Sequence, residues 1–231
     1  MSLELAESLK RAGIQPVYAV VGEEDYLRDK SVAAIRAAAL GAEAECGFNY
    51  DVFYGDDAAL EDVLACAAEV PVFAGRRVVV YKSAEKLSAR EGDKLLSYLS
   101  APNETTTLIV TSAKLDGRLK WTQALGKRAV TVNCAPLREG QLPSWIRQEA
   151  AALGLKVHEE AIPLLKEVGG ESLYAVRREL EKLAAYVPAG QMLQPSDVEA
   201  LRGTEPGASV FDLVNAIAAH DAGRAIRILA R

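Results

Sequence analysis

The sequence is poor in the side chains that bind metals or form disulfides. Its 231 residues include three cysteines and two histidines, and no two cysteines have the Cys-x-x-Cys spacing of a zinc or redox motif. We interpret Cys46, Cys66 and Cys134 as reduced thiols. His158 and His220 belong to different segments, and each is expected to be a solvated surface residue. The sequence predicts no metal site and no catalytic residues.

The sequence also lacks a long apolar run and an excess of basic residues. No apolar segment approaches the ~20 residues that span a membrane, and residues 1–15 are amphipathic and charged, unlike a signal peptide. The chain has 27 Lys and Arg residues against 32 Asp and Glu residues, a formal net charge of −5. Any contact with nucleic acid must therefore be local. We expect a cytoplasmic protein with no membrane contact.

Apolar, β-branched segments alternate with helical patterns over residues 1–135. Strands are predicted at residues 16–21, 48–54, 78–81, 105–111 and 129–132. The segments between them place apolar side chains at helical spacing. Strands that alternate with helices form a parallel sheet covered by helices on both faces. We therefore expect an α/β domain with a five-stranded parallel sheet at residues 1–135.

Residues 136–231 are predicted to be largely helical. Helices are expected at residues 142–153, 159–168, 171–186 and 195–201, with glycine and proline between them. Together they form a small all-α domain at residues 136–203. Two further apolar helices are predicted within residues 204–231, and two helices cannot bury their own apolar faces well. We interpret residues 204–231 as the beginning of a third, truncated helical domain.

An α/β domain followed by a small helical domain is a common arrangement in ATPases, yet the phosphate-binding loop is missing. That loop would follow the first strand as Gly-x-x-x-x-Gly-Lys-Ser/Thr. In the segment Gly22–Ser31, Leu27 and Arg28 stand in the places of the second glycine and the lysine. Three acidic residues directly follow Gly22, and their carboxylates would repel a polyphosphate.

The acidic residues that would bind magnesium at the end of the third strand are also absent. Lys82 follows that strand, and the nearest carboxylate is Glu85, which we interpret as a surface ion-pair partner of Lys82 or Lys86. Without a phosphate loop and a metal site, the sequence predicts no cofactor and no phosphoryl transfer. The alternative is an active nucleotide hydrolase with an unusual phosphate loop at Gly22–Ser31.

An apolar pair stands before the third predicted strand, where a loop would normally be polar. Pro71 and Gly75 enclose Val72 and Phe73, and proline and glycine are typical of turns. The strand that follows, Val78–Tyr81, has the continuous apolar pattern of a strand buried on both faces. Val72 and Phe73 therefore either fill the core or bind a partner.

Basic residues concentrate between Ser112 and Val132, with Asp116 as the one acidic residue among them. They are Lys114, Arg118, Lys120, Lys127 and Arg128. A solvated helix and its loop would account for this cluster. The alternative is a contact with the phosphate backbone of DNA, which positions a protein without reading base sequence. The chain would then be a DNA-backbone-binding module.

Five segments spread along the whole chain carry a family resemblance. The longest is Pro16–Leu27, with the sequence PVYAVVGEEDYL. The others are Leu115–Arg118, Leu137–Ile146, Gly170–Leu173 and Glu179–Leu183. In this combination they resemble the bacterial DNA polymerase III delta subunit family, whose members are clamp-loader subunits that open the sliding clamp.

The resemblance implies an AAA+-like α/β domain without a functional phosphate loop, a three-helix lid domain and a C-terminal helical collar, most of which is missing here. It implies a non-catalytic accessory subunit of a DNA-directed DNA polymerase holoenzyme, acting in DNA replication. The implied partners are the sliding clamp and the other clamp-loader subunits. Primer-template DNA is a further expected partner if the basic cluster contacts the DNA backbone.

The resemblance also implies a function for the apolar pair Val72 and Phe73. In the family such a pair binds the clamp, and Val72 and Phe73 occupy its position. A leucine commonly precedes the phenylalanine, so Val72 departs from the pattern and is expected to weaken the contact. The Ser-Arg-Cys motif that supplies an arginine finger in active neighbouring subunits has no counterpart, and Thr111–Lys114 stands near its place.

Overall fold

The computed structural model of the chain describes residues 3–41, 47–170, 172–188 and 190–202, together with residues 217, 221–223 and 226. The chain divides into two units, Met1–Leu137 and Arg138–Arg231. This division lies next to the boundary expected at residue 135. The third domain expected at residues 204–231 falls outside the described residues apart from those isolated positions.

The first unit alternates helices and strands along the chain. Its elements are α1 (Leu3–Ala12), β1 (Val17–Val21), α2 (Asp25–Leu40), β2 (Tyr50–Tyr54), α3 (Leu60–Ala68), β3 (Arg77–Lys82), α4 (Ala89–Ser100), β4 (Thr106–Ser112), α5 (Lys120–Arg128) and β5 (Val130–Asn133). A 3-10 helix at Ala84–Lys86 follows β3.

The five strands form one parallel sheet in the order β2-β3-β4-β1-β5. β1 lies between β4 and β5, with Val17 paired to Leu108 and Tyr18 paired to Val130. The residues Val78–Tyr81 of β3 are at most 2% exposed, as expected for a central strand of a parallel sheet covered on both faces. The predicted α/β class with a five-stranded parallel sheet is confirmed.

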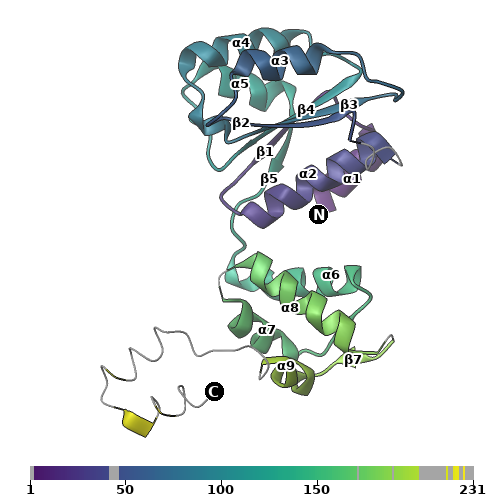
Figure 1. Ribbon diagram of the computed structural model, residues 1–231, viewed down its shortest axis with the longest axis vertical. Helices are drawn as coiled ribbons and strands as arrows, with labels where there is room; N and C mark the ends of the chain where they lie inside the picture. The colour runs from purple at the N-terminus through teal and green to yellow at the C-terminus, as the bar shows by residue number, and fades with distance from the viewer. Residues whose placement is uncertain are drawn as a thin grey trace. The chain divides into compact units, whose positions relative to one another are not determined.

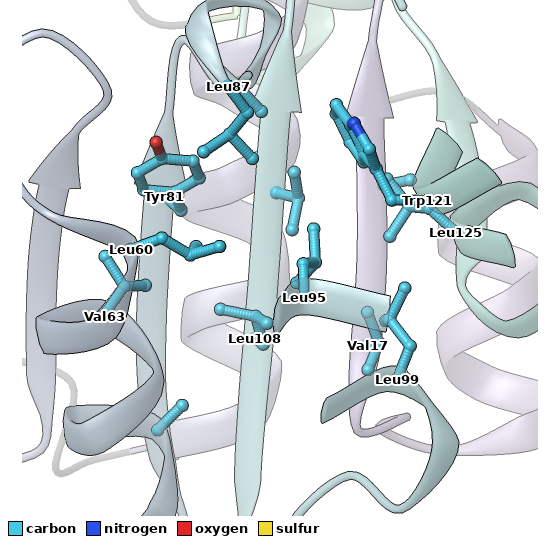
Figure 2. Packing of buried hydrophobic residues seen from close by; sticks show 14 of the residues in the cluster. Val17, Leu60, Val63, Tyr81, Leu87, Leu95, Leu99, Leu108, Trp121 and Leu125 are labelled. Carbon is cyan, nitrogen blue, oxygen red and sulfur yellow. The ribbon is translucent and has the colours of Figure 1, made fainter. Parts of the chain in front are cut away.

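Alternate residues of the strands face two separate apolar cores. Val79, Tyr81 and Leu108 pack with side chains of α3, α4 and α5, and Figure 2 shows this core. Val78 and Val80 pack with side chains of α1 and α2 on the opposite face. Figure 1 shows α3, α4 and α5 covering one face of the sheet and α1 and α2 the other.

The helices over the first core pack closely because one residue of α4 is a glycine. A Cβ at Gly92 would lie 1.9 Å from Cδ1 of Trp121 on α5, and Trp121 is buried. Ser88 caps the start of α4: its hydroxyl accepts a hydrogen bond from the Glu91 N–H, and the Glu91 carboxylate accepts one from the Ser88 N–H. This capping box fixes the start of α4.

The second unit is helical, with one small sheet that the sequence pattern did not predict. Its helices are α6 (Leu142–Ala152), α7 (Ala161–Gly169), α8 (Leu173–Tyr186) and α9 (Pro195–Arg202), after a 3-10 turn at Glu139–Gln141. Strands β6 (Lys156–Val157) and β7 (Met192–Leu193) pair in parallel. Strands of two residues are too short to show an alternating pattern. The described residues thus form four helices where the family resemblance implied a three-helix lid.

Glu149 of α6 is 1% exposed and is held by α8. Its carboxylate oxygen Oε2 lies 3.1 Å from Nη1 of Arg177. A buried charge is tolerated when a partner of opposite charge and hydrogen bonds compensate for lost hydration.

Over the part of the chain that the structure describes, no helix is long and apolar enough to cross a membrane.

Candidate partner-binding loop

The segment Val70–Gly75 connects α3 to β3 at the edge of the sheet where the parallel strands begin (Figure 1). Its apolar side chains point to solvent. Phe73 is 99% exposed, Val70 77% and Val72 44%. Val72 and Phe73 therefore do not fill the core, and the first of the two interpretations of this pair is wrong. Exposed apolar side chains that are grouped together mark interaction sites more often than isolated ones do.

The backbone of Phe73 has an unusual conformation. Its φ is +54°, in the left-handed region, and among the described residues only Ser83 shares this property without being a glycine. For a bulky residue this conformation costs on the order of 1–3 kcal/mol, and it persists only where surrounding contacts determine it. The Phe73 side chain cannot supply those contacts, because almost all of its surface is exposed.

Asn49 supplies contacts to the residue before Phe73. Its side chain donates a hydrogen bond from Nδ2 to the Val72 carbonyl (2.8 Å) and accepts one at Oδ1 from the Val72 N–H (2.7 Å). The Asn49 carbonyl accepts from the Val78 N–H of β3 (2.8 Å), and Asn49 is 7% exposed. Each hydrogen bond contributes about 1 kcal/mol net. Two of them are enough to offset much of the strain at Phe73.

A buried arginine ties together the elements beneath the loop. The Arg77 side chain is 7% exposed, and its guanidinium contacts Asp51 of β2 at 2.5 Å and Glu69, at the end of α3, at 3.0 Å. The same group donates to Sγ of Cys66 at 3.2 Å. Burial, reinforced by the nearby Asp51 carboxylate, raises the pKa of the Cys66 thiol to about 11. Cys66 is therefore a neutral thiol at pH 7, and it packs against the first apolar core.

The sequence pattern did not indicate a role at this loop for two residues, the exposed Phe48 and the buried Asn49. Phe48 is 74% exposed and was placed in the second strand, which begins only at Tyr50. Asn49 carried no pattern that could mark it, because its partner Val72 is 23 residues away. We name the exposed apolar group Phe48, Val70, Val72 and Phe73 the apolar tip.

Polar groups at the start of the segment Gly22–Ser31, where a phosphate-binding loop would stand, form hydrogen bonds within the protein. The Gly22 N–H donates to the Ser112 carbonyl and the Glu24 N–H to the Cys134 carbonyl, each at 3.0 Å. Glu24 also caps α2, since its side chain accepts from the Tyr26 N–H, and burial raises the pKa of Glu24. Arg28 donates to the Gly22 carbonyl. Three backbone N–H groups at the start of this segment, those of Gly22, Glu24 and Tyr26, are therefore already used within the protein and are not free for a phosphate.

The ends of β3 and β4 are likewise linked by polar contacts. Lys82 pairs with Asp29 of α2 at 2.9 Å, and Lys86 pairs with Asp56 at 3.3 Å. Glu85 accepts a hydrogen bond from the Ser112 hydroxyl at 2.7 Å. The prediction that Glu85 pairs with Lys82 or Lys86 is wrong.

In the described ranges, no group of three or more His, Cys, Asp or Glu side chains could hold a metal ion.

The five basic residues of the predicted DNA contact stand in two groups, one at each end of α5. Lys114 and Arg118 precede α5 at the edge where β4 ends and Lys120 begins the helix, whereas Lys127 and Arg128 end it beside the start of β5. The nine residues of α5 separate these groups by about 12 Å along the helix axis.

Two of the five are also engaged with other side chains. Arg118 pairs with Asp116 at 2.7 Å, and its hydrogen bonds lower the pKa of Asp116 to about 2. Arg128 donates to the Ser100 hydroxyl at 2.7 Å. The DNA contact stays a prediction, now for two separate groups of charge.

Comparison with known proteins identifies the family. A family model described as DNA polymerase III, delta subunit, matches residues 18–135, just over half of the chain. The chain belongs to the DNA polymerase III delta subunit family. The DNA polymerase III subunit delta of Bacillus subtilis (strain 168) is 26% identical, over 94% of this chain and 65% of that protein. The probable DNA polymerase III subunit delta of Aquifex aeolicus (strain VF5) is 25% identical, over 92% and 62%.

Solved structures show the same fold. The Bacillus subtilis DNA clamp loader delta protein is 25% identical with a TM-score of 0.78, covering all of this chain and 70% of that one. The Thermotoga maritima RuvB Holliday junction branch migration motor has a TM-score of 0.53 at 16% identity, a likeness of fold alone. This delta-family chain spans less than two thirds of the length of the two curated relatives.

Proposed function

We propose that this chain is a non-catalytic component of the DNA polymerase III clamp loader, which binds and opens the sliding clamp during DNA replication. The observation that carries the proposal is the 99% exposure of Phe73 at a position where the chain holds it in a left-handed backbone conformation. Membership of the delta family and the printed name of the Bacillus subtilis relative, a DNA clamp loader delta protein, support it.

The contact with the clamp is made by Val72 and Phe73. An aromatic side chain that enters an apolar pocket of a partner is an interface hot spot of about 2 kcal/mol or more. Phe73 gives up almost no packing within its own chain when it binds, because its surface is exposed beforehand. The loop is already ordered by Asn49, so little conformational entropy is lost on association.

Opening of the clamp follows from a difference in affinity. A protein shifts a ring from closed to open only to the extent that it binds the open form more tightly. Val72 and Phe73 provide the attachment, and the sheet with Arg77 and its partners provides a rigid base. The other clamp-loader subunits are proposed as further partners.

The two alternative functions have weaker support. A nucleotide hydrolase would need N–H groups and a cation for the phosphates, and the Gly22 and Glu24 N–H groups donate to Ser112 and Cys134 instead. For a DNA-backbone module, two of the five basic residues, Arg118 and Arg128, are already engaged with Asp116 and Ser100. No specific observation favours either function over clamp binding.

The test is the affinity of the chain for the sliding clamp encoded by the same genome, measured by surface plasmon resonance. Phe73→Ala should weaken binding at least about 30-fold, the equivalent of ~2 kcal/mol, while the free energy of unfolding in urea stays within about 0.5 kcal/mol of wild type. Val72→Leu, which restores the common residue of the family, should strengthen binding several-fold.

Tyr186→Ala is the matched control, because Tyr186 is an aromatic residue 54% exposed in the second unit. It should leave clamp affinity unchanged. Equal losses from Tyr186→Ala and Phe73→Ala, or unchanged clamp affinity in a folded Phe73→Ala protein, would contradict the proposal.

A further inference from the structure

The loop that displays Phe73 is held from a distant part of the chain. Asn49 lies next to the start of β2, and its side chain binds both backbone polar groups of Val72, at 2.8 and 2.7 Å. One carboxamide thereby donates to a peptide carbonyl and accepts from the N–H of the same residue. This is the pairing that a neighbouring β-strand would otherwise provide.

Asn49 is itself fixed in place. Its carbonyl accepts from the Val78 N–H, and the next residue, Tyr50, is paired with Val78 in the sheet. Asn49 is largely buried. If its hydrogen bonds to Val72 broke, a buried carboxamide group would be left without partners, which costs free energy. The position of Val72 is therefore set by the sheet through Asn49, whereas Phe73 makes almost no side-chain contact that could hold the loop.

We propose that Asn49 is a positioning residue for partner binding: it holds Val72, and thereby Phe73, in the projecting conformation without touching the partner. The identity of the partner as the sliding clamp rests on the proposed function above. Without the two hydrogen bonds, the left-handed conformation of Phe73 becomes one of several that the loop adopts. Only the fraction of molecules with the projecting conformation then binds productively.

This role differs from that of a contact residue in its kinetics. Loss of a contact accelerates dissociation, whereas loss of a positioning residue lowers the competent fraction and so slows association. Asn49→Ala should lower the association rate constant for the clamp about tenfold and leave the dissociation rate constant within about twofold. Phe73→Ala should instead act mainly on dissociation.

A second measurement does not depend on the clamp. The Val72 N–H donates to Asn49 Oδ1, so its hydrogen exchange in the full chain, followed by NMR, reports this bond directly. Asn49→Ala should remove the protection of the Val72 amide and leave that of Val80, inside β3, unchanged. Asn49→Asp keeps the acceptor for the Val72 N–H and loses the donor to its carbonyl, so it should retain part of the protection. Asn49→Asp also provides the test of Val72 exchange if Asn49→Ala does not fold.

The matched control is Asn133→Ala. Asn133 also holds a local turn, since its Oδ1 accepts from the Ala135 N–H, but it ends β5 at the other edge of the sheet. It should change neither Val72 exchange nor clamp association. Unchanged Val72 exchange in folded Asn49→Ala would overturn the positioning role, as would a loss confined to the dissociation rate. If the wild-type protein fails to bind the clamp, the proposed function is wrong. Hydrogen exchange at the Val72 amide still tests whether Asn49 holds the loop, because that measurement does not involve the clamp.

Discussion

Gly22, at the end of β1, lies against the backbone of Cys134, which follows β5. A Cβ at Gly22 would stand 2.1 Å from the Cys134 carbonyl carbon and 2.5 Å from the Ala135 nitrogen, and the φ of Gly22 is +149°. Gly22 is also the residue at which a phosphate-binding loop would begin. The glycine is accounted for by this close approach of two backbones, with no phosphate involved.

Substitution of Gly22 should destabilise the first unit strongly. In Gly22→Ala the new Cβ meets backbone atoms, which cannot rotate away, and the residue must adopt a conformation that L side chains rarely take. Overpacking and backbone strain together should cost about 3 kcal/mol or more. Urea unfolding followed by circular dichroism measures the loss.

Gly126→Ala is the control for this experiment. Gly126 lies within α5, and a Cβ there would meet nothing within 4 Å. Alanine favours a helix interior over glycine by about 0.5–1 kcal/mol, so this variant should be slightly more stable than wild type. A Gly22→Ala protein as stable as wild type would refute the close approach.

Phe48 should add to clamp binding if the apolar tip acts as one surface. The side chain is 74% exposed and precedes Asn49, so Phe48→Ala should leave stability nearly unchanged and reduce clamp affinity about three- to tenfold, less than Phe73→Ala. Tyr54, an exposed aromatic residue at the other end of β2, is the control, and Tyr54→Ala should have no effect. Full clamp affinity in Phe48→Ala would confine the contact to the α3–β3 loop.

We expect no binding of ATP and magnesium to the degenerate phosphate loop. The Gly22 and Glu24 N–H groups are bonded to carbonyl oxygens, and the carboxylates that follow Gly22 repel phosphate. Isothermal calorimetry should give no binding heat for wild type or for Arg28→Ala, in which the side chain that contacts the Gly22 carbonyl is removed. A dissociation constant in the micromolar range would instead support the nucleotide hydrolase.

Any DNA contact should use one end of α5 and not both. Lys114 and Lys120 lie near the start of the helix and Lys127 and Arg128 at its end. If one pair contacts phosphates, its double alanine variant should reduce the slope of log affinity against log salt by about 2, with the other pair as the matched control. Fluorescence anisotropy with primer-template DNA at several salt concentrations measures this slope. Equal slopes for wild type and both variants would leave the basic residues as a solvated surface.

The regular elements were predictable because their signal is local. The apolar run Val78–Tyr81 and the alternation of strand and helix patterns are properties of consecutive residues, and all five strands were found near their predicted positions. Contacts between distant residues were not predictable in this way. The pairing of Glu85 was misassigned to neighbouring lysines, whereas Ser112 of β4 is its actual partner. β6 and β7 depend on a pairing between residues 36 positions apart and leave no local pattern.

Residue type and spacing are enough to predict the parallel α/β sheet, the lack of a phosphate-loop motif and the apolar pair at Val72 and Phe73. Whether that pair is buried or displayed depends on contacts between residues that are far apart in the sequence. The answer depends on Asn49, which binds Val72 from beside β2, and on Arg77, which pairs with Glu69 at the start of the connection. Phe73 projects because hydrogen bonds from elsewhere in the chain hold a conformation that its own sequence does not favour.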